Sequence, residues 1–177
     1  MASVAAKAVG QAKDLLTKLI YGNATVFRRT MNLYPPFLGA GIRIARVSKD
    51  FREIDVELRR TRGNGNAFGT HFGGSLYAMV DPFYVLMFVA ILGPGHLVWD
   101  KAAKIEFLRP GKGTVTAKFR LTDADIDAAR AAIADGSKYL PVFTVEVRDA
   151  AGELVARIEK ELYLRRQPAR KGKPAAA

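Results

Sequence analysis

The sequence has 177 residues, of which 49% are hydrophobic, and a formal net charge of +11. A chain of this length fits one compact domain that buries about 70% of its unfolded surface. The apolar content excludes disorder over most of the chain. The absence of cysteine excludes disulfides and thiolate chemistry, although it identifies no compartment.

The N-terminal residues 1–33 are predicted to form a helical extension. Apolar residues recur at helical spacing between residues 5 and 21, and a second short helix is expected after Asn23, ending before the breaker at residues 34–36. Lys7 and Lys13 interrupt the apolar positions, so we predict no secretory signal and expect a cytoplasmic protein.

The next segment changes to the two-residue period of a strand. Ile54, Val56 and Leu58 alternate with charged residues, and Ile42 and Ile44 indicate a hairpin partner. Residues 61–70 are rich in Gly and Asn and are predicted to form a loop.

Residues 73–92 are apolar on all sides and end at a Gly-Pro-Gly sequence. The run is too long for an ordinary strand, so we predict a buried central helix. Its uninterrupted apolar part, residues 83–92, is well short of the roughly 20 residues that span a bilayer.

The remaining segments are predicted to surround this helix. Residues 103–107 and 115–121 alternate on either side of a turn, as a hairpin would. Thr122 and Asp125 form a capping-box signature for a helix that ends at Gly136, and two strands follow over residues 143–147 and 156–164. The prediction is an α+β domain over residues 34–165, in which an antiparallel sheet of about six strands curls around the central helix.

Asp81 is the one acid in the apolar stretch from residue 76 to residue 92. A carboxylate among apolar neighbours loses hydration, which is costly unless the group has a partner or a function. Asp81 and Pro82 could instead form the N-cap and first residue of a new helical segment. The glycines Gly73 and Gly74 stand where the loop enters the helix, where free N–H groups can stabilise an oxyanion.

The stretch from residue 66 to residue 81, NAFGTHFGGSLYAMVD, resembles the helix-start motif of hotdog-fold thioesterases of the phenylacetyl-CoA thioesterase branch. The motif has an Asn, a Gly seven positions on and an Asp eight positions further, and Asn66, Gly73 and Asp81 keep both spacings. The resemblance implies that Asp81 is the general base or nucleophile. It also implies that the Gly73 N–H polarises the thioester carbonyl and that Asn66 orients substrate or water.

The resemblance extends to the strand-turn-strand sequence IEFLRPGKGTVTAKF, where basic residues meet the nucleotide end of coenzyme A. Arg109 and Lys112 occupy that turn, although turn cations can also simply face solvent. Gly74, His71 and Phe72 are the other expected substrate-binding residues, and a hydrogen bond to backbone is the alternative for His71. The resemblance implies a homodimer or homotetramer and no cofactor, with coenzyme A only as part of the substrate. His71 and the other histidine, at position 96, stand in no acid-rich motif, so we predict no metal site.

One residue departs from the motif. The family usually has His directly before its first Gly, whereas this chain has Phe72 there and resembles a hotdog group known as a domain of unknown function. The prediction is therefore an acyl-CoA thioesterase-like hydrolase, and the alternative is a non-catalytic hotdog protein that binds acyl-CoA or an acyl lipid.

A second alternative comes from the basic C-terminal end. Residues 166–177 are predicted to be a basic, disordered tail without acids. Such a tail suits nucleic acid or an anionic membrane, while the simpler interpretation is a solvated segment that maintains solubility.

Overall fold

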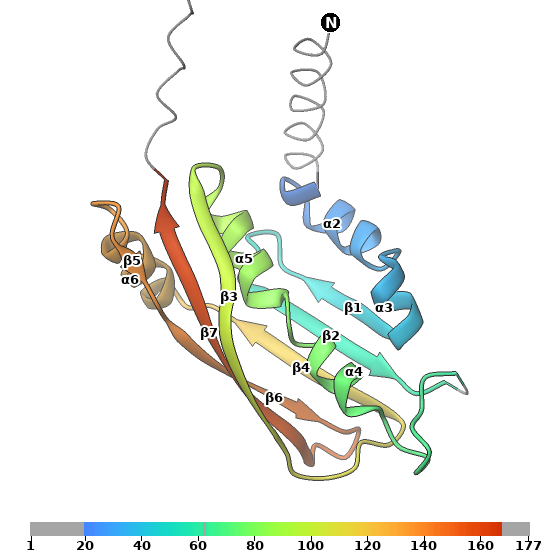
Figure 1. Cartoon of the computed structure of the whole chain (residues 1–177). Coiled ribbons are helices and arrows are strands. Elements are labelled where there is room, and N and C mark those ends of the chain that lie inside the picture. Colours follow the sequence, from blue (N-terminus) through green and yellow to red (C-terminus); the bar gives the residue numbers. More distant parts are fainter. Residues whose placement is uncertain (1–19, 62, 168–177) are drawn as a thin grey trace, which may run out of the picture.

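The computed structural model describes residues 20–61 and 63–167. Its strands form one antiparallel sheet in the order β1-β2-β4-β6-β7-β3, with β5 paired to β7 (Figure 1). The strands are β1 (Ile42–Val47), β2 (Glu53–Arg59), β3 (His96–Phe107), β4 (Thr114–Arg120), β5 (Lys138–Tyr139), β6 (Val142–Arg148) and β7 (Leu154–Arg166). The expected α+β architecture with an antiparallel sheet is confirmed.

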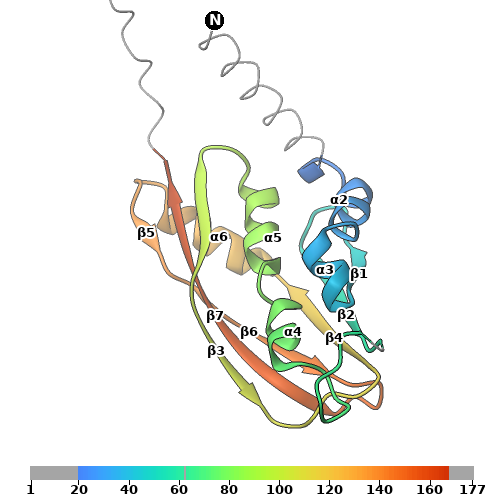
Figure 2. The ribbon, with the colours of Figure 1, turned by 45° about the vertical axis from the view of Figure 1, so that its right-hand side comes forward.

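The helices divide between one face and the ends of the sheet. They are α2 (Ala24–Met31), α3 (Pro35–Ala40), α4 (Gly73–Ala78), α5 (Phe83–Leu92) and α6 (Asp123–Ala132). Figure 2 shows α4 and α5 running along the hollow side of the curved sheet, while α2 and α3 lie beside β1. The predicted curling of the sheet around the apolar segment is confirmed.

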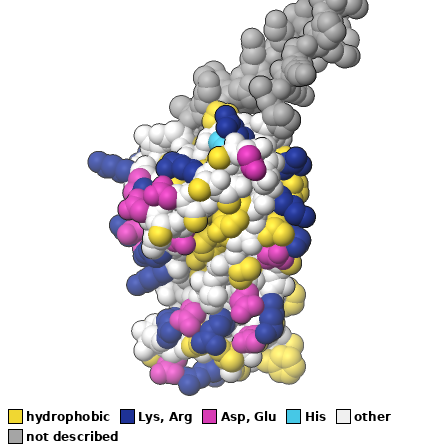
Figure 3. Space-filling model, turned by 90° about the vertical axis from the view of Figure 1, so that its left-hand side faces the viewer, with side chains coloured by type: hydrophobic (Ala, Val, Ile, Leu, Met, Phe, Trp, Pro, Cys, Tyr) yellow, Lys and Arg dark blue, Asp and Glu magenta, His cyan; other side chains and the backbone are white. Residues whose placement is uncertain are grey.

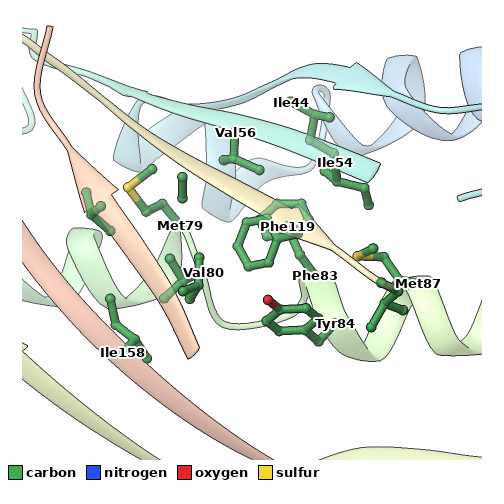
Figure 4. Close-up of a cluster of buried hydrophobic side chains, with 14 of the residues drawn as sticks. Ile44, Ile54, Val56, Met79, Val80, Phe83, Tyr84, Met87, Phe119 and Ile158 are labelled. Atoms are coloured by element: carbon green, nitrogen blue, oxygen red, sulfur yellow. The ribbon is translucent and has the colours of Figure 1, made fainter. Parts of the chain in front are cut away.

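Aromatic side chains from α5 and β4 form the centre of the core (Figure 4). Phe83 and Phe119 have 0% exposure, and their ring centroids are 5.0 Å apart. Tyr84 meets Phe119 edge-on at 5.2 Å. These contacts fix α5 against the sheet, and thereby position the segment that precedes it.

Several local predictions are confirmed. Asn23 caps α2 by accepting hydrogen bonds from two backbone N–H groups. Ile44 pairs with Val56 between β1 and β2. Thr122 and Asp125 form the predicted capping box of α6.

Other predictions were wrong in detail. The single central helix is two helices, because Pro82 cannot continue the backbone ladder. The second short helix, α2, does end before residue 34 as predicted, but a further helix that was not predicted, α3, begins at Pro35, where the fixed φ of proline suits the first turn. The strands β3 and β4 are not a hairpin, since β3 pairs with β7 and β4 pairs with β2 and β6.

Two of the predicted segments lie at the ends of the chain. The helix predicted over residues 5–21 and the tail predicted over residues 166–177 lie almost wholly outside the described residues, although Arg166 is the last residue of β7 and not part of a tail. Within those residues, Gly73–Leu92 is long and apolar enough by composition to cross a membrane. Core segments pass the same test, and here Phe83, Met87 and Phe88 have no exposed surface because they pack into the domain.

We expect Phe83→Ala to lower the free energy of unfolding by about 3–5 kcal/mol, because it leaves a cavity in the centre of the core. The measurement is urea unfolding, with Phe68→Ala as the control, since Phe68 is 89% exposed. Equal losses in the two variants would contradict this description of the core.

Candidate functional site

Asp81 lies in the break between α4 and α5. The chain leaves helical geometry after Ala78, and the Asp81 N–H donates to the Tyr77 carbonyl at 3.0 Å. Helix α5 begins at Phe83, with Pro82 as its N-cap residue. The break turns the Asp81 side chain towards β7 and β3 instead of along the helix.

The Asp81 side chain does not cap α5. The start of α5 has no side-chain hydrogen bond, so the capping alternative is wrong. Asp81 instead accepts a hydrogen bond at Oδ1 from Lys160 Nζ, at 3.0 Å. Its side chain remains 45% exposed, whereas that of Lys160 is 0% exposed.

Lys160 also contacts Asp100 and Tyr77. Its Nζ lies 2.9 Å from Asp100 Oδ1 and donates to the Tyr77 hydroxyl at 3.2 Å. The Asp100 contact has the distance of an ion pair, but Oδ1 is buried without a well-aligned hydrogen bond. The ammonium also stands 5.1 Å from the centroid of the Tyr77 ring. We call these four residues, Tyr77, Asp81, Asp100 and Lys160, the lysine cluster.

Burial and charge act against each other in the lysine cluster. Burial alone would lower the pKa of Lys160, but bonds to Asp100, Asp81 and Tyr77 outweigh it and raise that pKa above its usual value. Burial raises the pKa of Asp100; Lys160 opposes the shift and Asp81 adds to it. Burial also raises the pKa of Tyr77. Lys160 is therefore a buried ammonium ion held by acidic neighbours.

The start of α4 carries two free backbone N–H groups. Gly73 and Gly74 are its first residues, and neither N–H donates to a backbone carbonyl among residues 20–61 and 63–167. Gly73 lines a cavity of about 340 Å³. The lining residues are Asn66, Thr70, His71, Gly73, Leu76, Phe107, Leu108, Arg109, Pro110 and Gly111.

Aromatic side chains lie close to both glycines. A Cβ on Gly73 would stand 3.3 Å from the Phe107 ring, and one on Gly74 would stand 2.4 Å from the Phe72 ring. Phe72 and Phe107 are 60% and 55% exposed. Gly74 therefore cannot carry a side chain without moving Phe72. The Phe107 ring lines the cavity beside Gly73, whereas Phe72 does not line it.

The side-chain amide of Asn66 holds its own loop. Its Nδ2 donates to Thr70 Oγ1 at 2.8 Å and to the His71 carbonyl at 3.1 Å. Its Oδ1 accepts from the N–H groups of Phe68 and Thr70, both at 3.0 Å. All four hydrogen-bonding positions of the amide are thus occupied by the loop.

His71 ties the same loop to the turn between β3 and β4. Its backbone N–H donates to the Gly111 carbonyl at 2.9 Å, and Nε2 lies 2.8 Å from the Gly113 carbonyl. The side chain is 3% exposed, and Nδ1 has no partner within the described part of the chain. Burial lowers the pKa of His71 below its usual value; the Gly113 carbonyl opposes this shift, and Arg60 adds to it. His71 is therefore neutral, and Nε2 is the donor.

The two cations of the turn differ. Arg109 lines the cavity and forms an ion pair with Glu153. Lys112 is exposed and forms no ion pair with the described residues. Only Arg109 is therefore positioned at the cavity beside Gly73.

The predicted site residues fall into two groups within one chain. Asn66, His71, Gly73 and Arg109 share the cavity, but Asp81 does not line it. The eight residues from Gly73 to Asp81 correspond to about 12 Å along a helix. Within one subunit, the carboxylate and the Gly73 N–H are not parts of a single pocket.

Sequence reasoning missed Lys160 and Asp100. A signal for Lys160 was available, because the alternation Ile158, Lys160, Leu162 puts the lysine on the buried face of β7. Asp100 had no comparable signal, since β3 begins four residues earlier, at His96, outside the segment predicted as a strand. Among the residues that the structure describes, no cluster of three or more His, Cys, Asp and Glu side chains could hold a metal ion.

The sequence of this chain matches the profile of one protein family. The sequence profile of a family described as a domain of unknown function (DUF4442) matches residues 22–164. No functionally curated protein matches the chain. The profile covers every element that contributes to the lysine cluster and to the cavity.

Solved structures share the fold at low identity. PA5026 from Pseudomonas aeruginosa, described as a protein of unknown function and probable thioesterase, is 20% identical, with a TM-score of 0.71 over 79% of this chain and 93% of its own. Thioesterase HI1161 from Haemophilus influenzae is 16% identical, with a TM-score of 0.61 over 84% and 94%. The PaaI protein from the phenylacetic acid degradation operon of E. coli is 17% identical, with a TM-score of 0.52 over 79% and 89%. These likenesses confirm the hotdog fold.

The neutral, buried state of His71 predicts a pH dependence of stability. The unfolded chain takes up a proton at His71 near pH 6.5, while the folded protein resists it until a lower pH, so stability falls as the pH drops through this range. We expect the urea midpoint to fall less in His71→Gln than in wild type between about pH 7.5 and about pH 5.5. His96→Gln is the control and should follow wild type. If the urea midpoint of His71→Gln fell with pH as steeply as that of wild type, the result would contradict the neutral, buried state of His71.

Proposed function

The chain belongs to the DUF4442 family, and we propose that it hydrolyses acyl-CoA or a related acyl thioester at the start of α4. The supporting observation is the Asp81 carboxylate, which Lys160 holds by one oxygen while the side chain stays 45% exposed. A half-exposed carboxylate held by a buried ammonium is an arrangement suited to acid-base or nucleophilic chemistry.

The reaction needs two groups in one place. The Gly73 N–H would donate to the thioester carbonyl oxygen, which gains negative charge as the carbonyl carbon is attacked. Asp81 would take a proton from the attacking water or attack the carbon itself. The thiol of coenzyme A leaves, and the acyl group is released as a carboxylic acid. General base action contributes about 10²- to 10⁴-fold to such a rate.

These two groups would have to come from two subunits. Asp81 lies about 12 Å along the helical segment from the Gly73 of its own chain, and a base must come within about 3.2 Å of the proton that it removes. In a two-fold dimer, a contact between Gly73 and the partner subunit's Asp81 is repeated with the roles exchanged. One dimer would then hold two complete sites.

Two features of the surface support a homodimer. The edge strand β3 pairs with β7 on one side only, and its other side offers unpaired backbone groups to a second strand. Helix α5 is apolar on all sides, yet Val85, Leu86 and Val89 are only half-buried by their own chain. Figure 3 shows a face on which hydrophobic side chains gather between charged ones. Association of two dimers into a homotetramer remains a prediction.

Coenzyme A would reach the site along the turn that follows β3. Arg109 borders the cavity, and Lys112 is exposed nearby in the same turn, so both could meet phosphates. Arg109 would leave its ion pair with Glu153 and bind a phosphate of the ligand. The aromatic rings of Phe72 and Phe107 would contact the acyl or thioester portion, because they border the helix start.

A non-catalytic acyl-CoA or acyl-lipid binding protein is the second candidate. The Asn66 amide favours this second candidate, because all four of its hydrogen-bonding positions are occupied. To orient water, the side chain would have to give up hydrogen bonds within its loop. The two candidates differ in whether the thiol of coenzyme A is released.

We expect wild type to release thiol from acyl-CoA and Asp81→Asn to lose about 10²- to 10⁴-fold in kcat/KM, because the amide cannot act as a base. A thiol-detecting dye measures this over short, long and aryl acyl-CoAs. Asp123→Asn, on exposed α6, is the control and should retain activity. Binding of acyl-CoA without any thiol release by wild type would favour the second candidate.

The two-subunit site is tested with a pair of variants at Gly73. Gly73→Pro removes the N–H at a first-turn position that tolerates proline, while Gly73→Ala adds the same Cβ and keeps the N–H. A mixed dimer of one Asp81→Asn and one Gly73→Pro subunit should recover about half of wild-type activity, because one of its two sites is intact. No recovery would show that each site lies within one chain.

A further inference from the structure

We propose that Lys160 is a positioning residue for Asp81: it binds one oxygen of the carboxylate and leaves the other oxygen for the substrate. This inference rests on the proposed function, because it assigns a role within the same site. Its basis is the geometry of the lysine cluster, which joins the helix break to β7 and the edge strand β3.

The donors of Lys160 match the available acceptors. A lysine ammonium has three N–H donors and no acceptor. The structure offers it three oxygens, on Asp81 at 3.0 Å, Asp100 at 2.9 Å and Tyr77 at 3.2 Å. A fully buried ammonium would be costly without such partners. Lys160 also has no exposed surface from which to reach a substrate, so its contribution must pass through Asp81.

The position of Lys160 in the sheet makes this contact rigid. Lys160 lies in β7, which is flanked by β6 and β3, and its cross-strand neighbours are Phe143 and Ala103. The small side chain of Ala103 leaves room for the lysine to extend over the inner face towards Asp81. A cation fixed by strands on both sides holds the carboxylate in one orientation, which a flexible surface lysine would not do.

The titratable and charged groups around Asp81 come from three elements packed against it. They are Tyr77 from α4, Asp100 from β3 and Lys160 from β7, while the first turn of α5 contributes no charged residue. With Lys160 present, two carboxylates share one cation. Without it, Asp81 and Asp100 would be like charges without compensation, and the pair would hold a proton to a higher pH.

Lys160→Met tests the role, because methionine keeps most of the volume and removes the charge. We expect carboxyl carbon NMR to show that titration of the Asp81 and Asp100 pair moves up by about one pH unit or more. The acid limb of the kcat/KM profile should move in the same direction, with the loss in kcat and not in KM. Lys101→Met is the matched control, since exposed Lys101 pairs with Glu161, and both readouts should follow wild type.

A second variant covers the case in which Lys160→Met does not fold. Asp100→Asn removes the carboxylate that competes with Asp81 for Lys160. The remaining carboxyl should therefore titrate at lower pH, and the acid limb of the kcat/KM profile should move to lower pH. A purely structural lysine would reduce activity in these variants with the pH profile unmoved, which would overturn the proposal.

The readouts separate this inference from the proposed function. Carboxyl titration that does not respond to Lys160→Met or Asp100→Asn overturns the positioning role, whether or not the protein is active. If carboxyl titration moves as expected in the variants but wild type releases no thiol from any acyl-CoA, the thioesterase proposal is overturned and the positioning role of Lys160 is supported.

Discussion

The structure depends on one buried cation. Lys160 lies in β7, next to the edge strand β3, with no exposed surface, and a buried ammonium is stable only with oxygen partners. Those partners come from Tyr77 and Asp81, at the end of α4 and in the helix break, and from Asp100 in β3, so the requirement joins these two segments to β7. Two constraints therefore determine where the Asp81 carboxylate lies. Pro82 ends the first helix beside it, and Lys160 fixes the direction of the side chain.

The same arrangement explains why one chain holds only half of the proposed site. The cavity at Gly73 is built by a loop whose Asn66 and His71 bind backbone groups, whereas Asp81 points from the helix break towards the sheet edge. An unpaired edge strand and a half-covered apolar helix lie on that side. The proposed catalytic geometry and the proposed subunit association would both depend on this surface.

Sequence patterns predicted the parts of this protein that depend on local chemistry. Alternation in β1 and β2, the Asn23 cap and the capping box of α6 are properties of a few neighbouring residues, and each was confirmed. The partner of β3 could not be predicted, because pairing depends on the whole sheet. The contact between Asp81 and Lys160 spans 79 residues. A lysine at a buried strand position was visible in the sequence, but its acceptor was not.

The most direct test of this account is the coupling between Asp81 and Lys160 in the free energy of unfolding. Urea unfolding of wild type, Asp81→Asn, Lys160→Met and the double variant gives a double-mutant cycle. The account predicts that the double variant is more stable than the sum of the single losses by about 1 kcal/mol or more, because the interaction between Asp81 and Lys160 is already lost when the second substitution is made. Additive losses, within about 0.5 kcal/mol, would contradict it.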